Sequence, residues 1–159
     1  MRVYPTRCSQ EVIDRAQSIK AGSAELLYAY IDVEPVTFNR GFYTVDVRYF
    51  YRVTADAFVG AARPVEVCGL AVFDKRAILF GSESGSKSFS SNAEGNEVQC
   101  CPQTSLPTAV VEAVDPLILS LKLVDVCECR PCDCGFVDIP AAVAACFGDE
   151  IVTSGDVHR

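Results

Sequence analysis

The amino-acid sequence predicts a mainly β protein: an antiparallel β-sandwich with one short N-terminal helix and a cysteine-rich C-terminal segment. Residues 43–54 alternate between apolar and polar side chains, further β-branched and aromatic runs follow them, and only residues 10–21 have helical spacing. We therefore divide the chain into an N-terminal arm and helix (1–22), a β-sandwich core (23–126) with a flexible loop (81–101), and a cysteine-rich segment with a tail (127–159).

The predicted helix covers Gln10–Ala21 and follows an extended lead-in. Ser9 is a candidate N-cap, and Gly22 is a candidate stop signal. The apolar residues in between recur at the spacing of one helix face. They are Val12, Ile13, Ala16 and Ile19.

Strands are expected on both sides of a hairpin turn at Asn39-Arg40-Gly41. The strand before the turn, Leu26–Phe38, contains Pro35, which restricts it to an edge or a bend. The strand after the turn shows the clearest pattern in the chain, and only Phe50 interrupts its polar face. Its apolar positions are Tyr43, Val45, Val47, Tyr49, Tyr51 and Val53.

Further strands are predicted beyond a turn at Val59–Pro64. They are Val65–Phe73 and Ala77–Phe80, with the charged residues 74–76 as a break between them. Leu106–Val126 is apolar and β-branched but is interrupted at Asp115-Pro116. We expect this stretch to form two short strands, or one strand that continues past a kink.

Two segments are predicted to lie outside the regular structure. Residues 81–101 are rich in Ser and Gly, which is typical of an exposed loop or a flexible arm. Asp149–Arg159 is expected to form an acidic or disordered tail.

The charge composition of the chain argues against two classes of binding partner. The 159 residues include 21 acidic and 14 basic side chains, giving a net charge of -7 and a pI near 4.7. Nucleic acid and anionic membrane surfaces both attract clustered Lys and Arg, so neither is an expected partner. No apolar run is long enough to span a bilayer, and no signal-peptide pattern follows Met1, so we expect synthesis without a signal peptide.

Nine cysteines are more than a chain of this length needs in order to fold. Their odd number means that at least one thiol stays free, binds a metal or pairs with another chain. Cys68 lies among apolar residues and is expected to be a small core residue. The remaining eight are candidates for cross-linking: Cys8, Cys100, Cys101, Cys127, Cys129, Cys132, Cys134 and Cys146.

The C-x-C-x-x-C-x-C array at Cys127, Cys129, Cys132 and Cys134 leaves three alternatives open. Its four thiols could form disulfides, bind one zinc ion as thiolates, or stay free. Structural zinc sites usually place two C-x-x-C pairs a dozen or more residues apart, and this compact array lacks that separation. The cysteine spacing of iron–sulfur ferredoxins is not matched either. Disulfides are therefore favoured, with no cofactor, and zinc is the alternative.

No catalytic residue is predicted. The only histidine, His158, is next to the C-terminus, so a Cys-His or Ser-His-Asp apparatus lacks a positioned base. Arg130 could lower the pKa of the Cys132 thiol, but that alone does not make a nucleophile. The aromatic residues of the strands are expected in the core or in subunit contacts, with a carbohydrate or peptide platform as the alternative. They are Tyr28, Tyr30, Phe42, Tyr43, Tyr49, Phe50 and Tyr51.

Three long stretches, Arg2–Asp14, Gly41–Tyr51 and Arg63–Leu70, resemble a family of cysteine-rich proteins from endospore-forming clostridia. The resemblance extends from Arg2 to about Val152. The rhythm of the strands is also similar to that of the β-rich domain of spore-coat morphogenetic proteins. The resemblance implies a spore-surface role in the coat, the exosporium or an appendage, where cysteine-rich proteins self-assemble into disulfide-hardened arrays.

These observations together predict a structural protein and not an enzyme. We expect it to bind copies of itself through repeating contacts, and to form a filament or lattice that disulfides lock on the spore surface or outside the cell. A thiolate metal-binding module of the zinc type is the alternative function.

Overall fold

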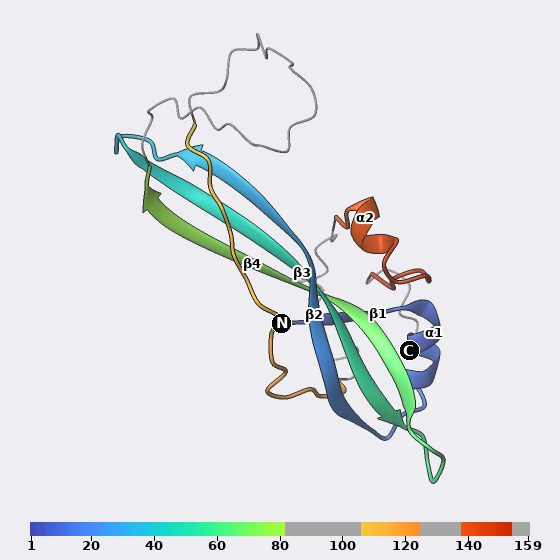
Figure 1. Cartoon of the computed structure of the whole chain (residues 1–159). Helices are drawn as coiled ribbons and strands as arrows, with labels where there is room; N and C mark the ends of the chain where they lie inside the picture. The colour runs from blue at the N-terminus through green and yellow to red at the C-terminus, as the bar shows by residue number, and fades with distance from the viewer. Residues whose placement is uncertain (82–105, 125–137, 154–159) are drawn as a thin grey trace, which may run out of the picture. The chain divides into compact units, whose positions relative to one another are not determined.

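The protein is built on one antiparallel β-sheet with few helices (Figure 1). A computed structural model describes residues 1–81, 106–124 and 138–153. The four strands have the order β1-β4-β3-β2. In chain order the elements are β1 (Val3–Pro5), α1 (Arg7–Ile13), β2 (Ser18–Pro35), β3 (Phe42–Phe58), β4 (Val65–Phe80) and α2 (Ala141–Ala144). The mainly β prediction is confirmed, whereas the described residues form a single open sheet and do not show a sandwich.

The chain divides into two compact units. The first unit comprises Met1–Tyr30, Arg48–Asp74 and Glu112–Arg159, and the second comprises Ile31–Val47 and Lys75–Val111. Strands β2, β3 and β4 each contribute residues to both.

The N-terminal helix is shorter than predicted and begins earlier. Thr6 is its N-cap, and the Thr6 hydroxyl accepts a hydrogen bond from the backbone N–H of Ser9, which is buried. The prediction of a helix to Ala21 is wrong because β2 starts at Ser18, just after Gln17 donates its backbone N–H to the carbonyl of Phe58. The apolar residues predicted for one helix face still pack together, on Ala55, Ala57 and Val67, but they do so from a helix, a turn and a strand.

Gly22 does not end a helix but lies inside β2. A Cβ atom added there would lie 2.8 Å from the backbone oxygen of Thr54, closer than a real Cβ atom tolerates. The Ser23 backbone N–H donates to the Thr54 hydroxyl at 3.1 Å. The absence of a side chain at Gly22 therefore allows β2 and β3 to approach closely.

Strand β3 confirms the strongest sequence pattern and extends it to Phe42–Phe58. Phe50, which interrupts the polar positions of the alternation, is 1% exposed and lies in the core, one of the two places expected for the aromatic residues of the strands. Tyr49 and Tyr51, predicted on the buried face, are only half-buried. Phe50 forms a core cluster in the first unit with Leu70 and Val143, so the face of β3 that carries Phe50 is covered at this point.

The predicted break at residues 74–76 does not occur, and β4 runs continuously from Val65 to Phe80. Asp74 forms a two-point ion pair with Arg48 of β3, at 2.6 and 3.0 Å. Arg76 pairs with Asp46 of β3 in the same way, with both distances 2.7 Å. The strand continues because cross-strand partners neutralise these charges.

The predicted hairpin turn at Asn39-Arg40-Gly41 is confirmed. Asn39 donates its backbone N–H to Val36, and Phe42 donates to Asn39. Gly41 has φ +84°, which favours glycine, whereas the fully exposed Phe38 has φ +71° without that freedom. The turn therefore contains one residue in a conformation that costs energy.

Residues 106–124 form neither of the predicted strand arrangements. Pro107 and Pro116 lack the backbone N–H that a ladder needs, and no strand is found in this stretch. The segment is instead attached to the sheet of the first unit by side chains. Asp115 accepts a hydrogen bond of 2.9 Å from the backbone N–H of Leu26, and Leu121 packs against the cluster of Ala55, Ala57 and Val67.

Residues 149–153, the described part of the predicted acidic or disordered tail, form backbone contacts with the start of the chain. Val143 of α2 is 1% exposed within the Phe50 cluster. Ile151 forms an isolated antiparallel bridge with Thr6, and Val152 donates its backbone N–H to Pro5. Across the described ranges, no helix has the length and apolar character that crossing a membrane requires.

Candidate functional site

Three of the nine cysteines lie in the described part of the chain. Cys8 and Cys146 are exposed, Cys68 is half-buried, and all three are free thiols. The other predicted cross-linking and metal-binding residues lie outside the described ranges: Cys100, Cys101, Cys127, Cys129, Cys132 and Cys134. The predicted flexible loop also falls largely outside them, except for Gly81. Two cross-linking candidates are therefore accessible in the described part of the chain.

Cys8 lies at the start of α1, beside carboxylates from the far end of the chain. Its backbone N–H donates to Asp149 Oδ2 at 2.9 Å. Asp149 raises the pKa of the Cys8 thiol, first by a hydrogen bond and then by its negative charge. The same hydrogen bonds lower the pKa of Asp149. The thiolate, which is the nucleophile in disulfide exchange, is therefore disfavoured at Cys8.

Cys68 belongs to a small polar network between β4 and the start of α1. Its backbone N–H donates to Ser9 Oγ at 3.0 Å, and its sulfur lies 3.9 Å from both Ser9 Oγ and Thr6 Oγ1. Thr6 Oγ1 and Ser9 Oγ are 2.9 Å apart, and both residues are buried. Cys68 is thus partly enclosed, whereas a position in the core was predicted. It is a hydrogen-bond partner of the buried Thr6 and Ser9 hydroxyl groups.

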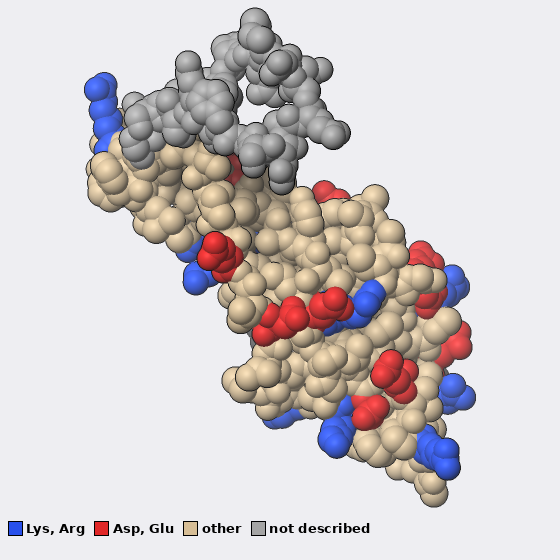
Figure 2. Space-filling model, viewed as in Figure 1, with Lys and Arg blue, Asp and Glu red and all other residues tan. Residues whose placement is uncertain are grey.

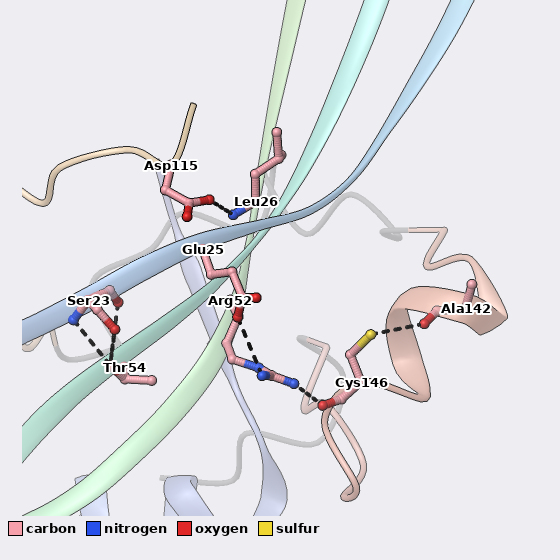
Figure 3. A network of polar contacts seen from close by, with 8 residues as sticks. All are labelled: Ser23, Glu25, Leu26, Arg52, Thr54, Asp115, Ala142 and Cys146. Atoms are coloured by element: carbon pink, nitrogen blue, oxygen red, sulfur yellow. Dashed lines mark hydrogen bonds and ion pairs between the residues drawn. The ribbon is translucent and has the colours of Figure 1, made fainter. Parts of the chain in front are cut away.

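Cys146 follows α2 and is linked to β3 through Arg52 (Figure 3). The Arg52 guanidinium donates to the Cys146 backbone carbonyl and pairs with Glu25 of β2 at 3.5 Å. The Cys146 thiol donates to the Ala142 carbonyl at 3.3 Å and remains exposed. Arg52 also lies over the Phe147 ring, 5.4 Å from its centroid. Backbone and neighbouring side chains therefore hold this thiol in place at the surface, a position that the sequence left undecided.

The predicted aromatic stripe divides into separate contacts. Tyr49 lies 6.1 Å from Tyr51 and 6.3 Å from Phe73, with the rings roughly parallel in each pair. Phe50 instead packs near Tyr28, at 6.2 Å and a tilted angle. Burial raises the pKa of Tyr51. Tyr49, Tyr51 and Phe73 thus form a short row, while Phe50 belongs to the core.

Exposed apolar side chains are the most prominent surface feature. In the described ranges they outnumber the buried apolar residues. The face in Figure 2 shows broad areas without charge between small groups of acidic and basic residues. The most exposed large apolar residues, leaving aside the terminal Met1, are Phe38, Leu119, Leu117, Val114, Val110, Phe80, Val124, Ile78, Tyr30 and Leu79.

The outer edges of the sheet are a second candidate surface. Strand β1 covers β4 only at Gly69, Leu70 and Ala71. Beyond Ala71 no strand of the described chain pairs with the outer side of β4, and none pairs with the outer side of β2. Unpaired N–H and C=O groups along such an edge can bind another strand. The edge position of β2 agrees with the restriction that Pro35 places on this strand, whereas the free edge of β4 was not anticipated, because strand order is not contained in local periodicity.

A shallow pocket in the first unit is lined by two aspartates and a glutamate, together with apolar residues. No group of three or more His, Cys, Asp or Glu side chains in the described ranges is arranged to hold a metal ion. No protein-family model, curated protein or solved structure matches this chain.

Proposed function

We propose that the protein is a self-assembling structural protein, which forms a disulfide-cross-linked filament or lattice on the spore surface or in another extracellular assembly. The observation that supports this most strongly is that, among the described residues, many large apolar side chains are exposed and the outer edges of β2 and β4 have no strand partner beyond the short β1. Monomeric soluble proteins rarely leave large contiguous apolar surface or long strand edges uncovered.

Residues 106–124 give this argument its strongest local form. Val110, Val114, Leu117 and Leu119 are each at least 80% exposed, although they are the type of residue that normally forms a core. We propose that a second copy covers them in the assembly. The β-sandwich expected from the sequence within one chain stays part of this proposal.

The cysteines would then make the contacts permanent. Cys8 and Cys146 are exposed thiols in the described part of the chain, and the contact with Asp149, which disfavours the Cys8 thiolate, makes oxidation at Cys8 slower than it would be without that carboxylate. We propose that they, together with Cys100, Cys101 and the array from Cys127 to Cys134, form disulfides between neighbouring copies. Each bridge typically stabilises by about 2–4 kcal/mol, and it also slows dissociation.

The spore surface is the setting favoured by the resemblance of Arg2–Asp14, Gly41–Tyr51 and Arg63–Leu70 to clostridial cysteine-rich proteins. Proteins made in the mother cell reach the spore surface without a signal peptide, and their thiols can oxidise after lysis. This sequence of events accounts for the large number of cysteines in the chain.

The test is electrophoresis after boiling the assembled protein in detergent, with and without reductant. We expect species larger than a monomer without reductant and monomers with it. A control sample, alkylated before assembly, should dissociate under both conditions. Full dissociation of the untreated protein without reductant would contradict the disulfide role. One zinc ion per chain without any disulfide would replace the proposal with the metal-binding alternative.

A further inference from the structure

The outer edge of β4 from Val72 to Phe80 has no partner strand in the described part of the chain. Four of its large apolar side chains are exposed, and Ile78 and Phe80 are the most exposed of them, at 62% and 74%. The other two are Phe73 and Leu79. A strand edge with this composition is suited to pairing with another strand.

The direction of the backbone groups along this edge follows from Cys68. Its carbonyl accepts from the Thr6 backbone N–H at 3.1 Å, and its own N–H donates to Ser9 Oγ, so both groups point away from β3. Alternate residues of an antiparallel strand point their backbone groups to the same side. The residues with outward N–H and C=O groups are therefore the even-numbered ones: Leu70, Val72, Asp74, Arg76 and Ile78.

The strand keeps this alternation to its end. The cross-strand contacts Arg48–Asp74, Asp46–Arg76 and Phe42–Phe80 all belong to one register between β3 and β4. No extra residue interrupts the ladder between them, because a bulge would shift the later contacts by one position. Asp74 and Arg76 thus share one face of β4, and Lys75 lies on the opposite face.

The two ion pairs give this edge a charge pattern that can match itself. Each ion pair lies in one cross-strand row, with one residue on β3 and the next on β4. One row contains Arg48 and then Asp74, and the neighbouring row contains Asp46 and then Arg76. The two rows therefore present opposite charges at the edge, two residues apart. If a second copy turns by half a rotation about Lys75, its Arg76 faces Asp74 and its Asp74 faces Arg76.

The outer edge of β2 offers a poorer contact. Its end in the second unit contains Asp32, Glu34 and Pro35, so two copies paired there would bring negative charges together. In the first unit, the side chain of Asp115 accepts the backbone N–H of Leu26 (Figure 3). Charged residues, lysine above all, and proline are usual means by which proteins prevent edge pairing, and at this end of β2 the charges all have the same sign, whereas those of the β4 edge have both signs.

We propose that two copies of this chain pair through the free edge of β4, antiparallel and centred on Lys75. The paired stretch runs from Val72 to Ile78 because β1 already covers the edge from Ala71 inward. Each row then reads Arg48, Asp74, Arg76 of the second copy and Asp46 of the second copy, so the charges alternate across four strands. Val72 lies opposite Ile78 of the second copy, which covers an exposed apolar side chain.

Charge selects this register over its neighbour. Centring the pair on Arg76 would place two Arg76 side chains directly opposite each other, which is unfavourable. Centring it on Lys75 also places two lysines opposite each other, on the other face, but satisfies two Asp–Arg pairs at once. This dimer rests on the proposed self-assembly. It supplies one closed, two-fold contact, so a different contact must extend the array.

Disulfide trapping tests the register in the full chain. Lys75–Lys75 is a non-hydrogen-bonded pair in this arrangement, with Cα atoms about 4.5 Å apart. That separation falls within the range that disulfides accept, so Lys75→Cys should cross-link two copies under mild oxidation with copper phenanthroline. Ala77→Cys is the matched control because its two copies lie four residues apart along the strands. Peptide mass spectrometry should find at least tenfold more disulfide between two position-75 thiols than between two position-77 thiols.

A second pair of variants tests the backbone contact without added thiols. Ile78→Pro removes an outward N–H that no strand of the described chain uses, so the sheet of each copy should stay intact. Sedimentation in reductant should show dimerisation at least tenfold weaker than in Ile78→Ala, which keeps that N–H. Equal dimerisation of the two variants would overturn the proposed interface.

The outcomes separate this interface from the proposed function. Assembly with no preference for position 75 over position 77 would overturn the β4 interface and leave the structural role standing. Strong cross-linking at position 75 in a protein that forms only dimers would support the interface and overturn the lattice or filament.

Discussion

Replacing Phe50 by alanine tests whether the face of β3 that carries this residue is covered at the centre of the strand. The Phe50 side chain is 1% exposed and packs with Leu70 and Val143, with Leu27 and Phe147 at the periphery. The sequence places Phe50 among the polar positions of the alternating strand and leaves two places for its ring, the core or a contact between subunits. A ring buried in the core and a ring exposed on the single chain give different stabilities for the same variant.

The magnitude follows from near-complete burial. Full burial of a phenylalanine side chain contributes about 1.5–3 kcal/mol by transfer from water. The cavity left by the ring adds to this, and buried Phe→Ala changes typically cost about 3–5 kcal/mol in total. Because about 1.4 kcal/mol corresponds to a tenfold change in an equilibrium constant, the unfolding constant of Phe50→Ala should rise by two orders of magnitude or more.

Urea unfolding in reductant, followed by circular dichroism, measures this cost. Phe38→Ala is the matched control because Phe38 is fully exposed. Its free energy of unfolding should differ from that of the wild type by less than about 0.5 kcal/mol. A loss below about 1 kcal/mol for Phe50→Ala would refute the placement of α2 and its neighbours over this part of β3.

Three further predictions concern single sites. Phe38→Gly should stabilise the protein by about 0.5–1 kcal/mol in urea unfolding, since Phe38 has φ +71°; equal or lower stability would contradict the strain at the turn. Asp149→Asn should lower the pKa of the Cys8 thiol and speed its alkylation by iodoacetamide at pH 7.5, with Cys146 as internal reference, and an unchanged Cys8 rate would contradict the contact. Arg76 lowers the pKa of Asp46, so this pair stabilises the fold above the unfolded carboxyl pKa of about 3.9 and loses the effect as pH falls through the folded value. The difference in urea midpoint between wild type and Asp46→Asn should thus be present at pH 6 and shrink by pH 2.5; a constant difference would exclude the ion pair as its cause.

Local patterns in the sequence identified the strands and turns that depend on neighbouring residues. The alternation along residues 43–54 and the turn at Asn39-Arg40-Gly41 predicted β3 and the hairpin before it. The helix prediction failed at Ser18 because Val12, Ile13, Ala16 and Ile19 have a spacing that also suits a helix, a turn and a strand on one apolar cluster. Pairing of β2 with β3, which a local window does not contain, determined the outcome.

The remaining differences arise from contacts between distant parts of the chain. The charges at residues 74–76 suggested a break, but their partners Arg48 and Asp46 are on another strand. Phe50 is covered partly by Val143, more than ninety positions along the chain. No periodicity within a single segment contains either relationship.

The cysteine sites show the same division. Cys8 was a cross-linking candidate and is exposed, whereas Cys68, expected to be a small core residue from its apolar neighbours, is only partly enclosed. The effect of Asp149 on the Cys8 thiol was not expected, because 141 positions separate them. The free edge of β4 was also unpredictable, since it depends on how far the three residues of β1 reach.

Negative-stain electron microscopy of the purified full chain, with and without reductant, tests the central claim most directly. The proposed function predicts regular filaments or lattices that persist without reductant. Dispersed monomers under both conditions would contradict it.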